Sequence, residues 1–424
     1  MPAETAPRTP RVRLHELDLL RFVAAMAVLL YHYTGSMGGP FKGEKARELF
    51  EPVSVLTQFG YLGVELFFLI SGFVILMSAW GRSMADFAAS RITRLYPAYW
   101  LAVLMIGAIY LTTGMGRGKP ETLIPNLTMF QQGMGVPNAS GVFWTLWAEM
   151  HFYALISILV LTGITYRRCL TFMAGWSVLA IFAKESGNDI LQSVLIPEYA
   201  PYFIAGMALY LIHRFGPSLM LWLMVAFSWA CSIRYALPTA VEHPYNVSRA
   251  DAWPAVAVLT TLVYALVALI ATGKLHRLRW KRFATLGALT YPTYLIHYEL
   301  GPLLSRALYP RLHPWAVVLV ITAIVLATAY LINKLVEEPA VRWLKPRLKD
   351  SFDRLSTSEP GQHRHRRARH TDPPAPGGGT PPGPGGPPPH GPTAPHPGTG
   401  GQTPAHHPDT PHGSTPSAPI GSTI

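Results

Sequence analysis

Residues 60–75 read GYLGVELFFLISGFVI, an apolar run in which Glu65 is the only charged residue. A helix that crosses a bilayer needs about 20 predominantly apolar residues, and this run lies within an apolar window that extends from about 55 to 79. Comparable windows lie near 17–35, 96–114, 143–163, 168–184, 194–213, 217–237, 252–272, 284–307 and 315–336. The pattern predicts an all-α polytopic membrane protein with about ten transmembrane helices.

The composition separates this apolar region from the two ends of the chain. Of the 424 residues, 50% are hydrophobic and only 14% are charged, whereas soluble domains carry about 25% charged residues. Beyond residue 350 the chain is dominated by Pro, Gly, His, Thr and Ser, which offer little apolar surface to bury. We therefore expect a polar basic segment at 1–13, a membrane domain at 14–350 and a disordered tail at 351–424.

Two further features limit the class of protein. The first apolar window lacks a small-residue cleavage site, so we expect it to remain as an anchor rather than to be removed as a signal peptide. The two cysteines, Cys169 and Cys231, form neither a disulfide framework nor a zinc-ligand spacing. The sequence therefore predicts no bound metal and no resident cofactor.

The net charge of +12 is spread among the short connections between apolar windows and is not gathered on one element. This distribution argues against a nucleic-acid partner and for a bilayer partner. About 18 Lys and Arg residues fall before the first window and in alternate connections, against about 10 in the opposite set, and basic connections stay on the cytoplasmic side. We expect a multi-pass protein of the cell membrane with both termini in the cytoplasm.

The first apolar window contains three ionisable residues, Asp18, Arg21 and His32. An ionisable side chain inside a transmembrane helix costs about 2.5–3.5 kcal/mol and is a functional candidate by default. Arg21 and His32 are eleven residues apart, close to three helical turns, so they share a face, and Asp18 is spaced to pair with Arg21. The alternative is a histidine that only packs, with Arg21 reaching to the headgroups.

Arg91 and Arg94 lie one helical turn apart just before Pro97, at the expected cytoplasmic end of the third helix. Two convergent guanidinium groups suit a phosphate or a pyrophosphate, because they bind its oxygens in pairs. The alternative is that both arginines only anchor the helix on the cytoplasmic side.

Four more polar residues interrupt apolar windows: Glu65, Glu149, His151 and His297. The tryptophans around Glu149 and His151 are typical of an interfacial aromatic belt, but such a belt does not account for a carboxylate further into the helix. Glu65 is compatible with a satisfied acid in a helix interface, and the small residues that follow it favour close helix packing.

Several stretches together resemble the acyltransferase-3 family of integral membrane O-acyltransferases. They are LHELDLLRFVAAMAVLLYH with the Arg21–His32 spacing, GVELFFLISGFVI, the Arg91–Arg94 pair before LYPAYW, FWTLWAEMHFY and YPTYLIH. They occur in the order typical of the family and span about residues 14–345. The chain departs from the family pattern at Leu20, where glycine is common, and at His151, where glutamine is frequent.

The resemblance implies an enzyme that takes an acyl group, expected to be acetyl, from cytoplasmic acyl-CoA as co-substrate. The acceptor would be a hydroxyl of a carbohydrate, a glycolipid or a small secondary metabolite such as a macrolide. By the same resemblance His32 carries the chemistry with Arg21, and we expect it to act as a general base. Glu149 would either orient this histidine or hold the hydroxyls of the acceptor. The other candidates are assigned to substrate binding: Arg91, Arg94, Asp18, His297, His151 and Glu65.

Two interpretations from other classes remain open at this point. In a secondary transporter or exporter, buried His, Glu and Arg side chains would form a proton relay. In a membrane scaffold, the Pro-rich tail would recruit partners. The pattern also leaves open whether His32 is a base or is itself transiently acylated.

Overall fold

The structure is a computed structural model that describes residues 13–36, 41, 46–116, 119–242, 249–276, 280–309 and 311–357. These residues are all-α and include no strand, so the predicted fold class is confirmed. The last helix continues to Thr357, seven residues past the boundary expected at 350. The rest of the expected tail, 358–424, and residues 1–12 of the basic N-terminal segment lie outside the described residues.

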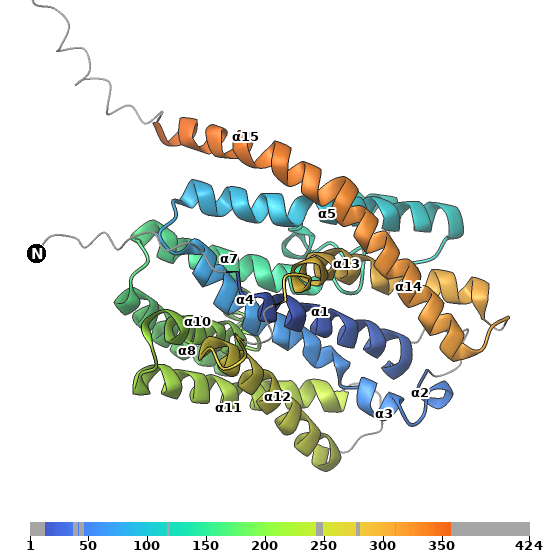
Figure 1. Cartoon of the computed structure of the whole chain (residues 1–424), viewed down its shortest axis with the longest axis horizontal. Helices are drawn as coiled ribbons and strands as arrows, with labels where there is room; N and C mark the ends of the chain where they lie inside the picture. Colours follow the sequence, from blue (N-terminus) through green and yellow to red (C-terminus); the bar gives the residue numbers. More distant parts are fainter. Residues whose placement is uncertain are drawn as a thin grey trace, which may run out of the picture. The chain divides into compact units, whose positions relative to one another are not determined.

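Long helices make up most of the described chain (Figure 1). They are α1 (His15–Leu30), α4 (Gly63–Ala79), α5 (Met84–Thr113), α7 (Trp144–Thr162), α8 (Tyr166–Ser186), α10 (Ala200–Phe215), α11 (Leu219–Glu242), α12 (Arg249–Ala271), α13 (Phe283–Leu308), α14 (Pro314–Ile332) and α15 (Glu338–Thr357). Short helices lie between them: α2 (Ala46–Leu49), α3 (Ser54–Thr57), α6 (Pro120–Leu127) and α9 (Asp189–Leu195).

Within the described residues, 8 helical segments are long and apolar enough to cross a membrane. They are His15–Gly35, Gly60–Ala79, Met84–Thr113, Trp144–Thr162, Asp189–Phe215, Leu219–Leu237, Ala252–Ala271 and Pro314–Phe352. The two remaining predicted windows coincide with α8 and α13. At 1.5 Å per residue these two helices are about 31 and 39 Å long, enough to cross a hydrocarbon core of about 30 Å.

Helix α13 carries several polar side chains that face the protein interior. Thr290, Thr293, His297 and Glu299 are all buried, on a helix that packs between α1 and α14. A polar residue on an interior helix meets protein groups rather than lipid, which is how membrane proteins accommodate such residues.

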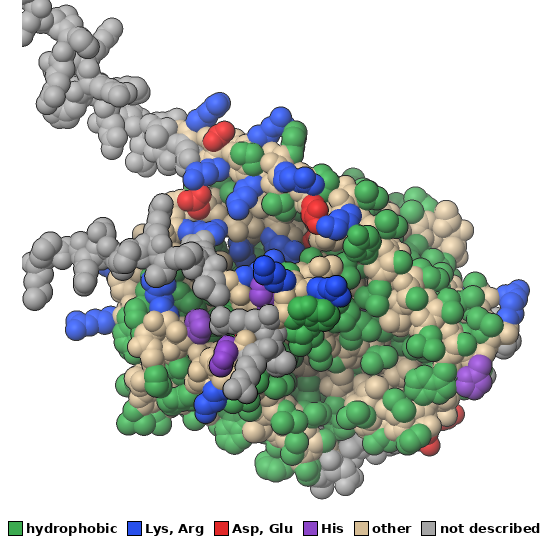
Figure 2. All heavy atoms as spheres, in the orientation of Figure 1, with side chains coloured by type: hydrophobic (Ala, Val, Ile, Leu, Met, Phe, Trp, Pro, Cys, Tyr) green, Lys and Arg blue, Asp and Glu red, His purple; other side chains and the backbone are tan. Residues whose placement is uncertain are grey.

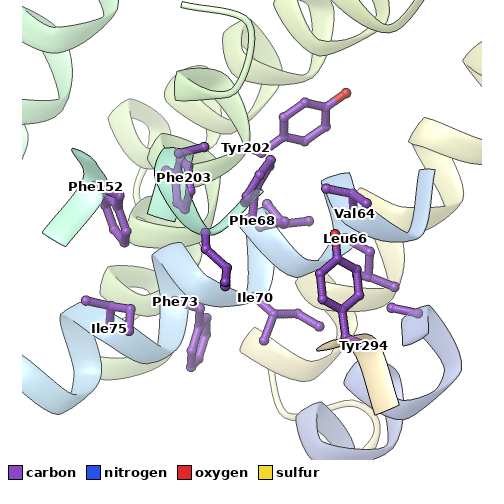
Figure 3. Close-up of a cluster of buried hydrophobic side chains, with 14 of the residues drawn as sticks. Val64, Leu66, Phe68, Ile70, Phe73, Ile75, Phe152, Tyr202, Phe203 and Tyr294 are labelled. Carbon is purple, nitrogen blue, oxygen red and sulfur yellow. The ribbon is translucent and has the colours of Figure 1, made fainter. Parts of the chain in front are cut away.

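Helices α4 and α10 pack backbone to backbone at the centre of the molecule. A Cβ atom at Gly206 would lie 2.1 Å from the carbonyl oxygen of Leu69, and one at Gly72 would lie 2.2 Å from that of Phe203. Small residues permit this approach, as predicted for Gly72. Aromatic rings fill the space beside the contact (Figure 3), where the ring centres of Phe203 and Phe68 are 4.9 Å apart.

Helix α1 is seated on α13 at two levels. Near its start, Asp18 lies against Gly287, where an added Cβ would come within 2.6 Å of the carboxylate oxygen. Near its end, Tyr33 lies against Gly301, where an added Cβ would come within 2.5 Å of the ring. The Tyr33 hydroxyl also donates a 2.8 Å hydrogen bond to the carbonyl of His297. The relative position of α1 and α13 is therefore fixed along their length.

Directly after α1 the chain continues into a π-helix, Tyr31–Gly35, that contains His32. π-Helical turns are rare in proteins, but many of those that occur lie at functional sites. A second π-helix, Asn333–Glu337, joins α14 to α15. Helix α15 then runs beside α5 (Figure 1), and Lys349 holds it there by a 3.0 Å ion pair with Asp86.

Candidate active site

A cavity of about 340 Å³ lies among α1, α4, α5, α7, α13 and α15. Its inner wall is apolar and aromatic, with Val64, Phe67, Phe68 and Leu146. Its polar lining consists mainly of Arg21, Arg91, Arg94, Glu149, Tyr153 and Lys345. In Figure 2, Lys and Arg side chains gather near α15, around a hollow in this face of the molecule.

The cavity carries an excess of positive charge. Four cationic side chains line it, Arg21, Arg91, Arg94 and Lys345, while Glu149 is the only carboxylate among the described lining residues. Cations gathered in a cleft with low-dielectric walls concentrate anions there. The cavity is therefore suited to an anionic ligand that also has an apolar part.

Arg91 is held by contacts from two helices. Its Nη2 donates to the hydroxyl of Ser90 at 3.0 Å and to that of Ser78, on α4, at 3.4 Å. The guanidinium carbon lies 5.8 Å from the ring centres of both Phe87 and Tyr153, within the range of a cation–π contact. These contacts fix the direction of the side chain at the cavity wall.

Arg94 is held from the other side. Nη1 of Arg94 lies 3.8 Å from Oε1 of Glu337. The other carboxylate oxygen of Glu337, Oε2, accepts a 2.7 Å hydrogen bond from the side-chain amide of Asn333. Its guanidinium carbon is 5.8 Å from the ring centre of Tyr291. The π-helix that precedes α15 therefore contributes the counter-ion of a cavity arginine.

Glu149 binds groups from α7 and α4. Its Oε1 accepts a 2.6 Å hydrogen bond from Tyr153 and a 3.4 Å hydrogen bond from Ser71. The guanidinium of Arg21 is attracted by the negative charge of Glu149 and repelled by the positive charge of Arg94. The structure thus brings together four of the residues that the sequence singled out, Arg21, Arg91, Arg94 and Glu149, in one cavity.

A second cluster, formed by His32 and His297, lies beyond the aromatic wall of this cavity. The wall includes Phe67 and Tyr294, whose ring centres are 5.8 Å apart. Tyr294 lies 5.7 Å from the ring of His297, which in turn lies 5.3 Å from the ring of His32. Neither histidine lines the cavity, so Arg21 and His32, expected on one face, belong to neighbouring sites.

The hydrogen bonding of His297 defines its tautomer. Its Nδ1 lies 2.8 Å from the carbonyl oxygen of Tyr294, and a carbonyl only accepts hydrogen bonds, so Nδ1 carries the proton of the neutral ring. Its Nε2 is buried and has no hydrogen-bond partner among the described residues. The side chain therefore presents an unpaired nitrogen lone pair next to the imidazole of His32.

Three predicted site residues lie outside both clusters. Asp18 forms its ion pair with Arg13, at 2.7 Å, and not with Arg21 as the spacing indicated. His151 places Nδ1 2.9 Å from the carbonyl of Trp147 and packs against that ring. Glu65 has one buried carboxylate oxygen, Oε2, without a hydrogen-bond partner in the described part of the chain, and it does not line the cavity.

The polar residues of the cavity that the sequence did not single out include Ser71, Tyr153 and Lys345. Ser71 was taken together with Gly72 as a packing residue, a role the structure gives to Gly72. Tyr153 follows Glu149 by one helical turn, a spacing that indicates contact within a helix. Lys345 carries no local signal, because only the packing of α15 on α5 brings it to the cavity. No group of three or more His, Cys, Asp or Glu side chains in the described ranges could hold a metal ion.

The fold and the site define a polytopic membrane protein with a cationic cavity next to a buried histidine pair. Residues 14–334 match the acyltransferase-3 family, described as an acyltransferase domain. The chain belongs to this family and is a membrane O-acyltransferase, as its motifs predicted.

Two relatives are similar to the chain over different lengths. Acyltransferase MdmB of Streptomyces mycarofaciens is 25% identical over 375 residues, which cover 79% of this chain and 94% of that protein. Nodulation protein 10 of Rhizobium leguminosarum bv. viciae is 27% identical over 214 residues, covering 44% of this chain and 54% of that protein. No solved structure matches the chain.

Proposed function

We propose that the enzyme transfers an acyl group, acetyl in the simplest case, from acyl-CoA to a hydroxyl of a carbohydrate, a glycolipid or a secondary metabolite such as a macrolide. The cationic cavity carries this proposal, because four cations face one carboxylate above an apolar inner wall. Acyl-CoA has the matching chemistry: several phosphate charges at one end and a thin, largely uncharged pantetheine arm at the other.

In the proposed complex the phosphates stay near the arginines and the arm points inward. Arg91 and Arg94 offer guanidinium groups on one side of α5 that can bind the diphosphate in pairs. Arg21 lies deeper along α1 and adds a third positive charge. The arm passes Phe67 and Phe68, so that the thioester approaches Tyr294, the residue that separates the cavity from His297.

His32 is the proposed general base. It accepts the proton of the acceptor hydroxyl as the oxygen attacks the thioester carbonyl carbon. The carbon–sulfur bond then breaks, and the CoA thiolate leaves and takes up a proton. The products are an ester and free CoA. His297, whose ring centre lies 5.3 Å from that of His32, is proposed to position this imidazole.

The proposed orientation places the mouth of the cavity, and both termini, in the cytoplasm. The cavity is lined by the start of α1, the start of α5 and α15, and the basic residues next to these segments belong to the set expected on the cytoplasmic side. Cytoplasmic acyl-CoA would reach the arginines directly from that side.

Radiolabelled acetyl-CoA tests the proposal on detergent-solubilised protein with envelope glycans, lipid extracts and macrolides as acceptors. We expect acceptor-dependent release of CoA and transfer of label, with a product heavier by one acetyl group. His32→Ala should lower this rate by 10²-fold or more, the size of a lost general base, at unchanged expression. Transport of a solute into vesicles without consumption of acetyl-CoA under any of these conditions would overturn the proposal.

A further inference from the structure

Four residues spaced by about one turn run from the end of the π-helix onto the face of α15 that meets α5: Glu337, Val341, Lys345 and Lys349. Each end of this face is tied to α5 by an ion pair, Glu337 to Arg94 at 3.8 Å and Lys349 to Asp86 at 3.0 Å. Val341 and Lys345, between the two ion pairs, line the cavity. The direction of the Lys345 side chain toward the cavity therefore follows from contacts on both sides of it.

Two other basic residues at this face, Arg94 and Lys349, each form an ion pair, but Lys345 forms none with a described residue. Arg94 has Glu337 and Lys349 has Asp86, whereas Lys345 forms no ion pair or hydrogen bond with any residue in the described ranges. A lysine that only solubilises a helix does not need to line a cavity. A lysine at the rim of a cationic cavity adds a mobile point charge for an anion.

The cavity cations lie at two depths. Lys345 is exposed, whereas Arg21, Arg91 and Arg94 are all partly buried. CoA also carries its phosphates at two positions. The diphosphate adjoins the pantetheine arm, and the 3′-phosphate is on the ribose at the far end. If the arm points inward, the diphosphate meets the deeper arginines and the 3′-phosphate meets the rim.

We infer that Lys345 binds the 3′-phosphate of the acyl donor, which makes α15 part of the donor site. This assignment rests on the proposed function, in which acyl-CoA occupies the cavity. It gives the C-terminal helix a specific role in recognising the donor, since the diphosphate is common to many nucleotides and the 3′-phosphate is not.

The test compares acetyl-CoA with acetyl-dephospho-CoA, which lacks only the 3′-phosphate, on purified full-length protein. For acetyl-CoA we expect Lys345→Ala to raise KM about tenfold, the effect of one lost charge-assisted hydrogen bond, with little change in kcat. For acetyl-dephospho-CoA the wild-type enzyme should already have the higher KM, and Lys345→Ala should raise it no further. Lys345→Arg should restore most of the affinity for acetyl-CoA.

Lys349→Ala is the matched control, because it removes a lysine one turn away on the same helix and breaks the ion pair with Asp86. It should change the KM of both donors by the same small factor. An equal rise of KM for both donors in Lys345→Ala, or equal KM values of the wild-type enzyme for the two donors, would overturn the assignment while leaving the proposed function intact. If the wild-type enzyme consumes neither thioester, the proposed donor is wrong and the assignment fails with it.

Discussion

The hydroxyl of Tyr153 donates a 2.6 Å hydrogen bond to Oε1 of Glu149, one turn away on α7. The same carboxylate oxygen accepts a hydrogen bond from Ser71 on α4. The two contacts hold the only carboxylate among the described residues of the cavity wall, which Arg21 also lines. The carboxylate of Glu149 is therefore fixed by groups from α7 and α4.

Tyr153→Phe should lower kcat/KM for the acyl donor by about tenfold. The change removes the 2.6 Å hydrogen bond but keeps the ring beside Arg91, and a hydrogen bond to a charged group contributes about 1.5–3 kcal/mol. Initial rates of CoA release measure the effect. Tyr166→Phe is the control, since that hydroxyl contacts Ser218 outside the cavity. Unchanged kinetics of Tyr153→Phe would show that Glu149 does not need this support.

His297→Phe should lower kcat by tenfold or more and leave the KM for acyl-CoA within about twofold. Phenylalanine preserves a ring between Tyr294 and His32 but removes the buried Nε2 lone pair, and lost acid–base assistance costs rate rather than ground-state affinity. Steady-state kinetics at varied donor concentration separate the two parameters. A raised KM with unchanged kcat would instead place His297 in donor binding.

His151→Gln should leave the kinetic constants for both substrates within about threefold. The His151 ring is engaged by its own helix, through the carbonyl and the ring of Trp147, and it does not line the cavity. The same acceptor panel as for the wild-type enzyme measures the effect. A change of preferred acceptor in this variant would show that His151 contributes to substrate binding, as the sequence predicts.

Gly206→Ala should destabilise the protein by about 1–3 kcal/mol, the usual cost of overpacking. The added Cβ would lie 2.1 Å from a backbone carbonyl of α4, so the two helices must move apart. Gly175→Ala on α8 is the matched control, because no atom lies within 4 Å of its added Cβ. It should be neutral or stabilising, by up to about 1 kcal/mol, since alanine favours helix. Thermal unfolding in detergent compares the two, and equal transitions would contradict the packing.

The sequence predicts ten of the long helices well because each contains an apolar run of about bilayer length. It does not predict α15, which is polar and lies beyond the last apolar window. It also identifies Arg21, Arg91, Arg94 and Glu149 as unusual, because an ionisable residue in such a run has a cost. The periodicity of a regular helix could not show that Arg21 and His32 fall into neighbouring sites. That separation depends on the ring of Tyr294 from another helix and involves a stretch with π-helical geometry.

Pairings across the chain could not be predicted in this way. Asp18 is three residues from Arg21 and five from Arg13, and the choice of Arg13 depends on how the segment before α1 folds back. Glu337 is the counter-ion of Arg94, which is more than 200 residues earlier in the sequence. This contact follows from tertiary packing, for which spacing along one helix carries no information.

The two glycine contacts between α1 and α13 have a consequence for how the enzyme adapts to its acceptors. With Asp18 seated on Gly287 and Tyr33 on Gly301, Arg21 at the cavity and His32 of the histidine pair lie along one segment that packs on α13. Arg21 and His32 are eleven residues apart, about 16 Å along a helix axis, so their spacing is set by the backbone and not by loop conformation. Loops can therefore change in length and sequence while the spacing between Arg21 and His32 stays constant.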